Sequence, residues 1–245
     1  MKGKNIRRVF VAAALLLLLL CGVVGLYAAD YYRADATAQA AMMDYSMASS
    51  AVYEIGEDIT VFAPEDPVAG FIFYPGGKVE YTAYAPLLRM LAGENILCAV
   101  VKMPLNLAVL DIDAAAGVRE KFSGIDDWYI GGHSLGGSMA ASYVAKNPKD
   151  YAGLVLLASY STEDLKETEL KVVSIYGSAD GVLNMEKYGQ YRSNLPDNAV
   201  EYVIEGGNHA QFGSYGHQDG DGQASVTAEE QTIMTALQIV DLIRK

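Results

Sequence analysis

The sequence predicts an α/β fold in which a mostly parallel central sheet is covered by helices on both faces. Short apolar runs alternate along the chain with segments whose apolar residues recur at helical spacing, as expected for strands buried on both faces. A glycine-rich turn at residues 131–137 follows the apolar run 128–130 and leads into a further helical segment. The 245 residues suffice for one such fold with a sizeable core.

The first 29 residues are expected to lie outside this fold. Segment 1–8 carries four basic residues, and the uncharged run of 21 residues at 9–29 is long enough to span a bilayer as a helix. The basic flank predicts a single-pass anchor with a cytoplasmic N-terminus and an extracytoplasmic remainder. A cleaved signal peptide, and hence a secreted protein, is the alternative. It is disfavoured because Leu26 and Tyr27 stand where cleavage sites require small residues. Leu20 likewise disfavours a lipoprotein site at Cys21.

The next segment, 30–50, is rich in Ala, Tyr and Met and is expected to form a juxtamembrane helix or stalk. The folded domain is then expected to span 51–245. It opens with two alternating segments, 52–55 and 59–62, which predict an antiparallel hairpin.

Strands and helices are expected to alternate through the rest of the domain. Further strands are predicted at 68–74, 96–101, 128–130, 154–158, 172–176 and 200–204, and helices at 81–92 and 135–146. A third helix is predicted where Leu107, Leu110, Ala114, Val118 and Phe122 recur at helical spacing. The last helix is expected to begin with the capping box at 227–230 and to turn Ile233, Leu237 and Val240 inward.

Charge and cysteine content restrict the possible partners and sites. The chain carries a net charge of −12, and without the four basic residues of segment 1–8 the remaining 14 basic residues face 30 acidic ones, a net of −16. This balance disfavours nucleic acid and anionic surfaces as partners. The chain holds two cysteines, Cys21 in the apolar run and Cys98 in an expected buried strand. Neither a disulfide within the exported domain nor a cysteine-based metal site is expected.

The glycine-rich turn predicts a nucleophile. Gly132, Ser134 and Gly136 form the pattern G-x-S-x-G between a strand and a helix, which is typical of a nucleophile elbow. Small neighbours let the strand and helix approach closely, and the tight turn strains the serine backbone. Ser134 would then lie at a helix N-terminus, where free N–H groups favour developing negative charge.

The histidine that could act as a general base is found by elimination among three. His133 adjoins the serine in so tight a turn that the two side chains are expected to diverge. His209 follows the strand 200–204 at its carboxyl end, where functional residues of parallel sheets gather. His217 lies further along a polar, glycine-rich stretch. We therefore expect His209 to be the base for Ser134.

Such a base needs an acid to orient its ring. Asp180 is the expected acid because it follows the strand 172–176 at its carboxyl end. The other carboxylates between the serine and the histidine, at 163–169, lie in a polar connection and are interpreted as solvated charges.

An oxyanion hole would require two backbone N–H donors aimed at the reacting oxygen. The N–H of Leu135, directly after the serine, is the first. The second is expected from the loop 75–78 that follows the strand 68–74, at Gly77 with Lys78 as the neighbouring alternative.

With these residues in place, the sequence from about residue 52 onward resembles the α/β-hydrolase superfamily, in particular compact, lidless members such as dienelactone hydrolase-like proteins. The order Ser134, Asp180, His209 matches the superfamily's order of nucleophile, acid and base. The connection 159–170 leaves no room for the cap domain that many relatives insert. Pro75 stands where many relatives have His, a departure that leaves the backbone donors available.

The stretch 211–223 after the expected base holds Asp219 and Asp221 among glycines. It lacks the remaining ligands of a calcium loop, so we interpret it as a rim loop near the substrate entrance. No metal or organic cofactor is expected.

Together these residues predict a serine hydrolase that cleaves a carboxylic ester or related acyl bond, in a small molecule or a surface-attached polymer. Two alternatives remain open: acyl transfer or peptide hydrolysis on the same fold, and a cell-surface binding module that has lost catalysis. The sequence leaves the substrate and the oligomeric state undetermined.

Overall fold

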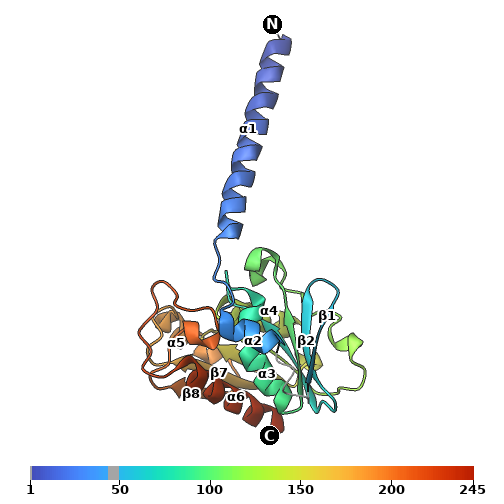
Figure 1. Ribbon diagram of the computed structural model, residues 1–245, viewed down its shortest axis with the longest axis vertical. Coiled ribbons are helices and arrows are strands. Elements are labelled where there is room, and N and C mark those ends of the chain that lie inside the picture. The colour runs from blue at the N-terminus through green and yellow to red at the C-terminus, as the bar shows by residue number, and fades with distance from the viewer. Residues whose placement is uncertain (1, 44–49) are drawn as a thin grey trace. The chain divides into compact units, whose positions relative to one another are not determined.

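The computed structural model describes residues 2–43 and 50–245, which form two compact units, Met1–Tyr31 and Tyr32–Lys245 (Figure 1). The first unit consists of helix α1 (Lys2–Ala29). In the part of the chain that the structure describes, no helix is long and apolar enough to cross a membrane. The expected membrane anchor at 9–29 is therefore not confirmed and stays a prediction.

The second unit is built on one eight-stranded sheet in the order β1-β2-β4-β3-β5-β6-β7-β8. The strands β3 to β8 run parallel to one another, whereas β2 pairs antiparallel with both β1 and β4. The predicted hairpin and the predicted parallel sheet are thus confirmed. The strands are β1 (Ser50–Ile55), β2 (Ile59–Pro64), β3 (Ala69–Tyr74), β4 (Ile96–Val101), β5 (Trp128–His133), β6 (Gly153–Leu157), β7 (Lys171–Gly177) and β8 (Val200–Ile204).

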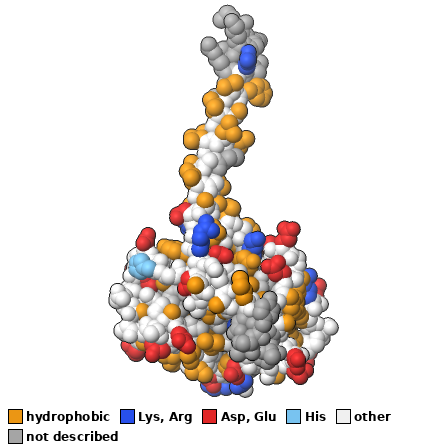
Figure 2. Space-filling view, in the orientation of Figure 1, with side chains coloured by type: hydrophobic (Ala, Val, Ile, Leu, Met, Phe, Trp, Pro, Cys, Tyr) orange, Lys and Arg blue, Asp and Glu red, His pale blue; other side chains and the backbone are white. Residues whose placement is uncertain are grey.

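Helices cover both faces of the sheet because side chains of a strand alternate between its faces. On β3, Phe71 and Phe73 join the core cluster shared with α2, α3 and α6, whereas Ile72 and Tyr74 join the cluster shared with α4. The helices of this unit are α2 (Ala36–Met43), α3 (Ala85–Gly93), α4 (Leu135–Lys146), α5 (Met185–Tyr191) and α6 (Ala228–Arg244). Figure 2 shows acidic side chains spread over the visible face of this unit, in keeping with the net charge.

The helix predicted over 107–122 is absent. The segment instead forms short 3-10 turns at Ala108–Leu110 and Arg119–Lys121, and a third such turn, Pro104–Asn106, directly precedes it. Gly117 has φ of +72°, which no α-helix accommodates. The buried Tyr74 hydroxyl donates to the Ile112 carbonyl and accepts from the Ala115 N–H, so a side chain from the sheet takes hydrogen bonds that a helix would make internally.

Helix α6 begins as predicted but buries a different face. Thr227 and Glu230 form the expected capping box. Ile233 and Leu237, predicted to point inward, are 41% and 59% exposed, whereas Val240 is buried as predicted. The inward face carries Gln231 and Thr235 in addition to apolar residues. Polar side chains therefore hold core positions that a hydrophobic pattern cannot identify.

Segment 30–50, expected to form a juxtamembrane helix or stalk, contains a helix that packs within the second unit. The described part of segment 30–50 includes α2, whose Ala38 is fully buried, and the Arg89 side chain donates to the Ala41 carbonyl at 2.7 Å. The compact unit thus begins at Tyr32 rather than at residue 51. Residues 44–49 of the predicted stalk lie outside the described residues.

Candidate active site

Four loops that follow parallel strands meet at one edge of the sheet. Because β3, β5, β7 and β8 are parallel, their carboxyl ends share that edge. The loops after these strands hold, in order, residues 75–78, Ser134, Asp180 and His209. Every residue predicted to take part in the chemistry therefore lies at the edge where parallel sheets usually bind their ligands.

The turn at Ser134 has the backbone expected of an elbow. Ser134 has φ of 52° and ψ of −122°, a conformation that strains a residue with a side chain. The glycines around it are required by close packing. An added Cβ at Gly132 would lie 2.4 Å from the Tyr74 carbonyl oxygen, and one at Gly136 would lie 2.3 Å from the Pro75 carbonyl oxygen. The strand, the turn and the helix are thus pressed directly onto the loop after β3.

Asp180 and His209 form a buried hydrogen-bonded pair. The distance from His209 Nδ1 to Asp180 Oδ2 is 2.9 Å, and the two side chains are only 2% and 1% exposed. The other carboxylate oxygen, Oδ1, accepts hydrogen bonds from the backbone N–H groups of Val182 and Leu183. A carboxylate held in this way keeps a proton on Nδ1 and leaves Nε2 of the ring as the acceptor.

The structure brings His209 beside the nucleophile turn but shows no hydrogen bond between His209 and Ser134. Nε2 of His209 is buried and has no hydrogen-bond partner among the described residues. The ring of His209 packs against the ring of His133, which directly precedes Ser134, with centroids 4.5 Å apart. Asp180 and His209, the expected acid and base, are therefore hydrogen-bonded to each other, and Nε2 of His209 is unengaged in a ring that packs on the residue before Ser134.

The two predicted oxyanion donors are neighbours in space. A Cβ added to Gly77 would lie 3.1 Å from Leu135 Cδ2. The flanking N–H groups are already used, because Gly76 N–H donates to the Tyr84 hydroxyl at 2.9 Å and Lys78 N–H donates to the Asn106 carbonyl at 2.7 Å. This favours Gly77 over Lys78 as the second donor.

The N–H groups at the two expected donor positions are unengaged. Outside the helices and strands, no hydrogen bond among the described residues engages the N–H of Gly77 or of Leu135. Leu135 is the first residue of α4, where N–H groups have no partner within the helix. Both groups can therefore donate to an incoming oxygen.

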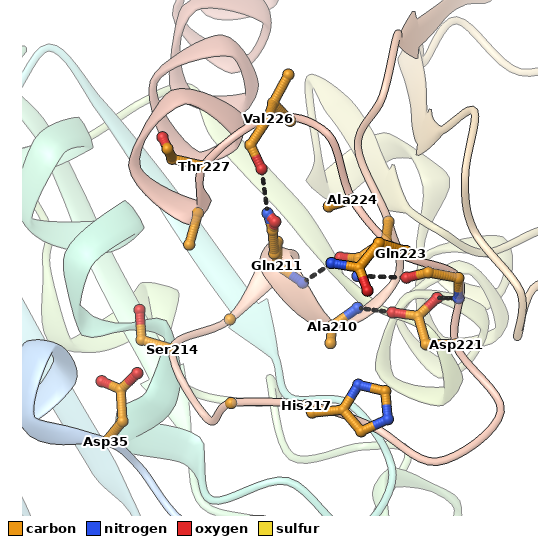
Figure 3. Close-up of a pocket in the computed structure, with 15 residues that line it drawn as sticks. Asp35, Ala210, Gln211, Ser214, His217, Asp221, Gln223, Ala224, Val226 and Thr227 are labelled. Atoms are coloured by element: carbon orange, nitrogen blue, oxygen red, sulfur yellow. Dashed lines mark hydrogen bonds between the residues drawn. The ribbon is translucent and has the colours of Figure 1, made fainter.

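Asp221 is a site residue that the sequence did not reveal. Its carboxylate accepts from the backbone N–H groups of His209 at 3.2 Å, Ala210 at 2.8 Å and Gly181 at 3.1 Å. Figure 3 shows the Asp221 carboxylate directed at the Ala210 N–H. The glycines around it predicted only a rim loop. Asp221 instead connects the loop that carries His209, the expected base, to the loop that carries Asp180, the expected acid.

The loop that contains Asp221 borders a cavity of about 500 Å³ (Figure 3). The exposed His217 lies on its rim, together with Asp35 from the segment before α2. In the described ranges 2–43 and 50–245, no three His, Cys, Asp or Glu side chains are grouped closely enough to hold a metal ion.

Comparison with known proteins gives one family and a set of structural neighbours. The model of a family described as "Alpha/beta hydrolase family" matches residues 70–233. No curated protein matches the sequence.

The structural neighbours are distant in sequence and similar in fold. A predicted CIB-like hydrolase from Thermoplasma acidophilum is 16% identical with a TM-score of 0.58, and the match covers 78% of this chain and 99% of that one. Est1E from Butyrivibrio proteoclasticus is 12% identical with a TM-score of 0.57, covering 80% and 100%. TT1662 from Thermus thermophilus is 14% identical with a TM-score of 0.59, covering 80% and 99%.

Proposed function

Because the chain belongs to the α/β hydrolase family, we propose that it is a serine hydrolase that cleaves a carboxylic ester or a related acyl bond. The observation that carries the proposal is the buried hydrogen bond between Asp180 and His209, placed beside the strained turn of Ser134. An imidazole oriented by a carboxylate next to an elbow serine is the arrangement that activates a hydroxyl nucleophile.

In the proposed reaction, Ser134 Oγ attacks the substrate carbonyl carbon while His209 Nε2 takes the hydroxyl proton. The carbonyl oxygen becomes an oxyanion that accepts hydrogen bonds from the N–H groups of Leu135 and Gly77. His209 then gives its proton to the leaving alcohol, which departs as the carbon–oxygen bond breaks. Water, deprotonated by His209, attacks the acyl-enzyme and releases the acid, and the proton returns to Ser134.

This mechanism needs Ser134 Oγ within hydrogen-bond reach of His209 Nε2. Catalytic hydrogen bonds of this kind are often long in the free enzyme and tighten when substrate binds. The unpartnered Nε2 and the ring contact with His133 support the proposal, because nothing else in the described structure competes for the nitrogen.

The test is reaction of the full chain with a fluorophosphonate probe, followed by identification of the labelled residue. We expect label on Ser134, none on Ser134→Ala, and normal labelling of Ser142→Ala, a matched change on the exposed side of α4. The Ser134→Ala variant should also lose on the order of 10⁴-fold or more in kcat on p-nitrophenyl acetate. Folded protein that takes no label would instead favour a binding module without catalysis.

The dienelactone hydrolase-like subtype is part of the proposal. It is supported by the connection from β6 to β7, residues 158–170, which is too short for a cap domain. An uncapped site fits small esters as well as chains attached to a surface. A panel of p-nitrophenyl esters of increasing acyl length tests this, and hydrolysis confined to long acyl chains would contradict it.

We also propose that residues 9–29 attach the protein to a membrane, with the catalytic unit outside the cytoplasm. The support is the uncharged run in the sequence with four basic residues before it. Fractionation of cells that express the full chain tests the proposal. Protein in the soluble fraction with these residues still attached would overturn it.

A further inference from the structure

The hydroxyl of Tyr84 lies at the centre of the loops that form the candidate active site. Tyr84 ends the 3-10 turn Tyr81–Tyr84 and is fully buried, with its ring 4.7 Å from the ring of Phe73. Its oxygen is 2.9 Å from the Gly76 nitrogen and 2.9 Å from His133 Nδ1. One side chain thus joins the loop after β3 to the residue that precedes Ser134.

The direction of each hydrogen bond follows from the chemistry of the groups. The Gly76 N–H can only donate, so the Tyr84 oxygen accepts from it and is left with its own O–H to donate. This O–H has no other acceptor among the described residues, so we assign His133 Nδ1, 2.9 Å away, as its acceptor, in a neutral ring protonated on Nε2. That Nε2 is buried and has no hydrogen-bond partner among the described residues. Burial, and after it the nearby His209, hold the pKa of His133 well below its usual range, which agrees with a neutral ring.

Backbone and aromatic rings pack closely around this pair. A Cβ added to Gly76 would lie 2.8 Å from the Tyr84 oxygen and 2.8 Å from His133 Nδ1, so the loop backbone is in direct contact with both groups. On its other side, the His133 ring packs on the base His209 and on Phe212, with centroids 4.5 and 5.7 Å away. The contacts run without interruption from the oxyanion loop through the nucleophile turn to the base.

We propose that Tyr84 is a positioning residue. Its hydroxyl, acting through His133, holds the Gly77 donor, the Ser134 turn and His209 at fixed positions relative to one another. The proposal rests on the proposed function and extends it to a residue outside the reacting groups. The hydrogen bond to Gly76 fixes the peptide directly before Gly77, and the hydrogen bond to His133 fixes the residue directly before Ser134. Displacements near 1 Å in such groups cost about a hundredfold in rate.

The experiment replaces Tyr84 with Phe in the full chain, which keeps the buried ring and removes only the hydroxyl. Tyr81→Phe is the matched control, because Tyr81 begins the same turn and packs its ring on the same core cluster. Turnover of p-nitrophenyl acetate is measured per active site, counted by fluorophosphonate titration, so unfolded protein does not enter the rate. We expect kcat to fall about ten- to a hundredfold in Tyr84→Phe and to change less than about twofold in Tyr81→Phe.

Two further readouts separate positioning from mere stability. KM should stay within about twofold, and the inhibition constant of phenylboronic acid, whose tetrahedral adduct resembles the transition state, should rise by the factor by which kcat/KM falls. A second pair of variants applies if Tyr84→Phe does not fold. His133→Asn keeps an acceptor for the Tyr84 hydroxyl, whereas His133→Leu removes it, and we expect the Asn variant to turn over faster.

An unchanged kcat per active site in Tyr84→Phe would overturn the proposal, even if the variant melts at a lower temperature. An increase in KM alone, or equal rates for His133→Asn and His133→Leu, would also overturn it. In each of these cases the wild-type chain still labels on Ser134 and the proposed function stands. Wild-type protein that neither labels nor turns over would refute the proposed function, and the positioning role with it.

Discussion

The backbone N–H of His209 donates to Asp221 across 3.2 Å, so the candidate base is held from two sides by two different carboxylates. Asp180 accepts from its ring, and Asp221 accepts from its main chain. The hydrogen bond to Asp180 sets the tautomer of the imidazole ring. The hydrogen bond to Asp221 fixes the backbone from which the His209 side chain extends. Because Asp221 also accepts from Gly181, it fixes the distance between the acid and base loops.

Replacement of Asp221 by Asn should therefore impair the enzyme without touching the reacting groups. The amide keeps one oxygen but turns an NH₂ group toward a backbone N–H, which leaves buried donors without an acceptor. We expect kcat to fall about tenfold and the free energy of unfolding to fall by about 1–3 kcal/mol. Ester turnover and urea denaturation measure the two effects. Asp219→Asn, an exposed neighbour in the same loop, is the control, and equal behaviour of both variants would contradict the role of Asp221.

The buried His133 predicts a pH-dependent stability. Burial and, after it, the proximity of His209 lower the pKa of His133 well below its usual range, so the folded chain keeps it neutral. The unfolded chain binds a proton there near pH 6.5. Unfolding thus takes up a proton at acidic pH, and the contribution of His133 to stability is present above about pH 6.5 and is lost as the pH falls below it.

Urea denaturation at pH 7.5 and 5.5 measures this effect. The loss of unfolding free energy between the two pH values should be smaller in His133→Asn than in the wild type, by about 1.4 kcal/mol. Carboxylates titrate in both proteins. Subtracting the loss of unfolding free energy in His133→Asn from the loss in the wild type therefore removes their contribution. The same loss in both would show that His133 takes up a proton equally in the folded and unfolded chains.

The sequence was sufficient to predict the sheet and the residues after its strands, because those signals are local. A continuous apolar run marks a buried strand such as β7, and Asp180 and His209 stand in the short loops that follow β7 and the more exposed β8. The G-x-S-x-G turn likewise needs only adjacent residues to be recognised. The rule that parallel strands share one functional edge then grouped residues that are far apart in the chain.

The features that the sequence did not predict depend on contacts between distant segments. The segment 107–122 has helical spacing, but the Tyr74 hydroxyl from the sheet takes its hydrogen bonds at Ile112 and Ala115. Tyr84 and Asp221 accept hydrogen bonds from backbone groups that they meet only after folding, so no spacing rule predicts these contacts. From the sequence alone, a tyrosine in an apolar segment indicates a core residue, and an aspartate among glycines indicates a loop.

The last prediction concerns the close approach of the nucleophile helix to the loop after β3. A methyl group at Gly136 would lie 2.3 Å from the carbonyl oxygens of Tyr74 and Pro75, and backbone cannot yield as a flexible side chain can. We expect Gly136→Ala to lower the melting temperature strongly and to abolish labelling of Ser134, because the turn must move away from the oxyanion loop. Gly189→Ala in α5 is the control: nothing lies within 4 Å of its added methyl group, and replacing a helical Gly should raise stability by about 0.5–1 kcal/mol. Thermal melts of the three proteins, with labelling in parallel, decide the matter, and a fully labelled, stable Gly136→Ala would refute the tight packing of the elbow.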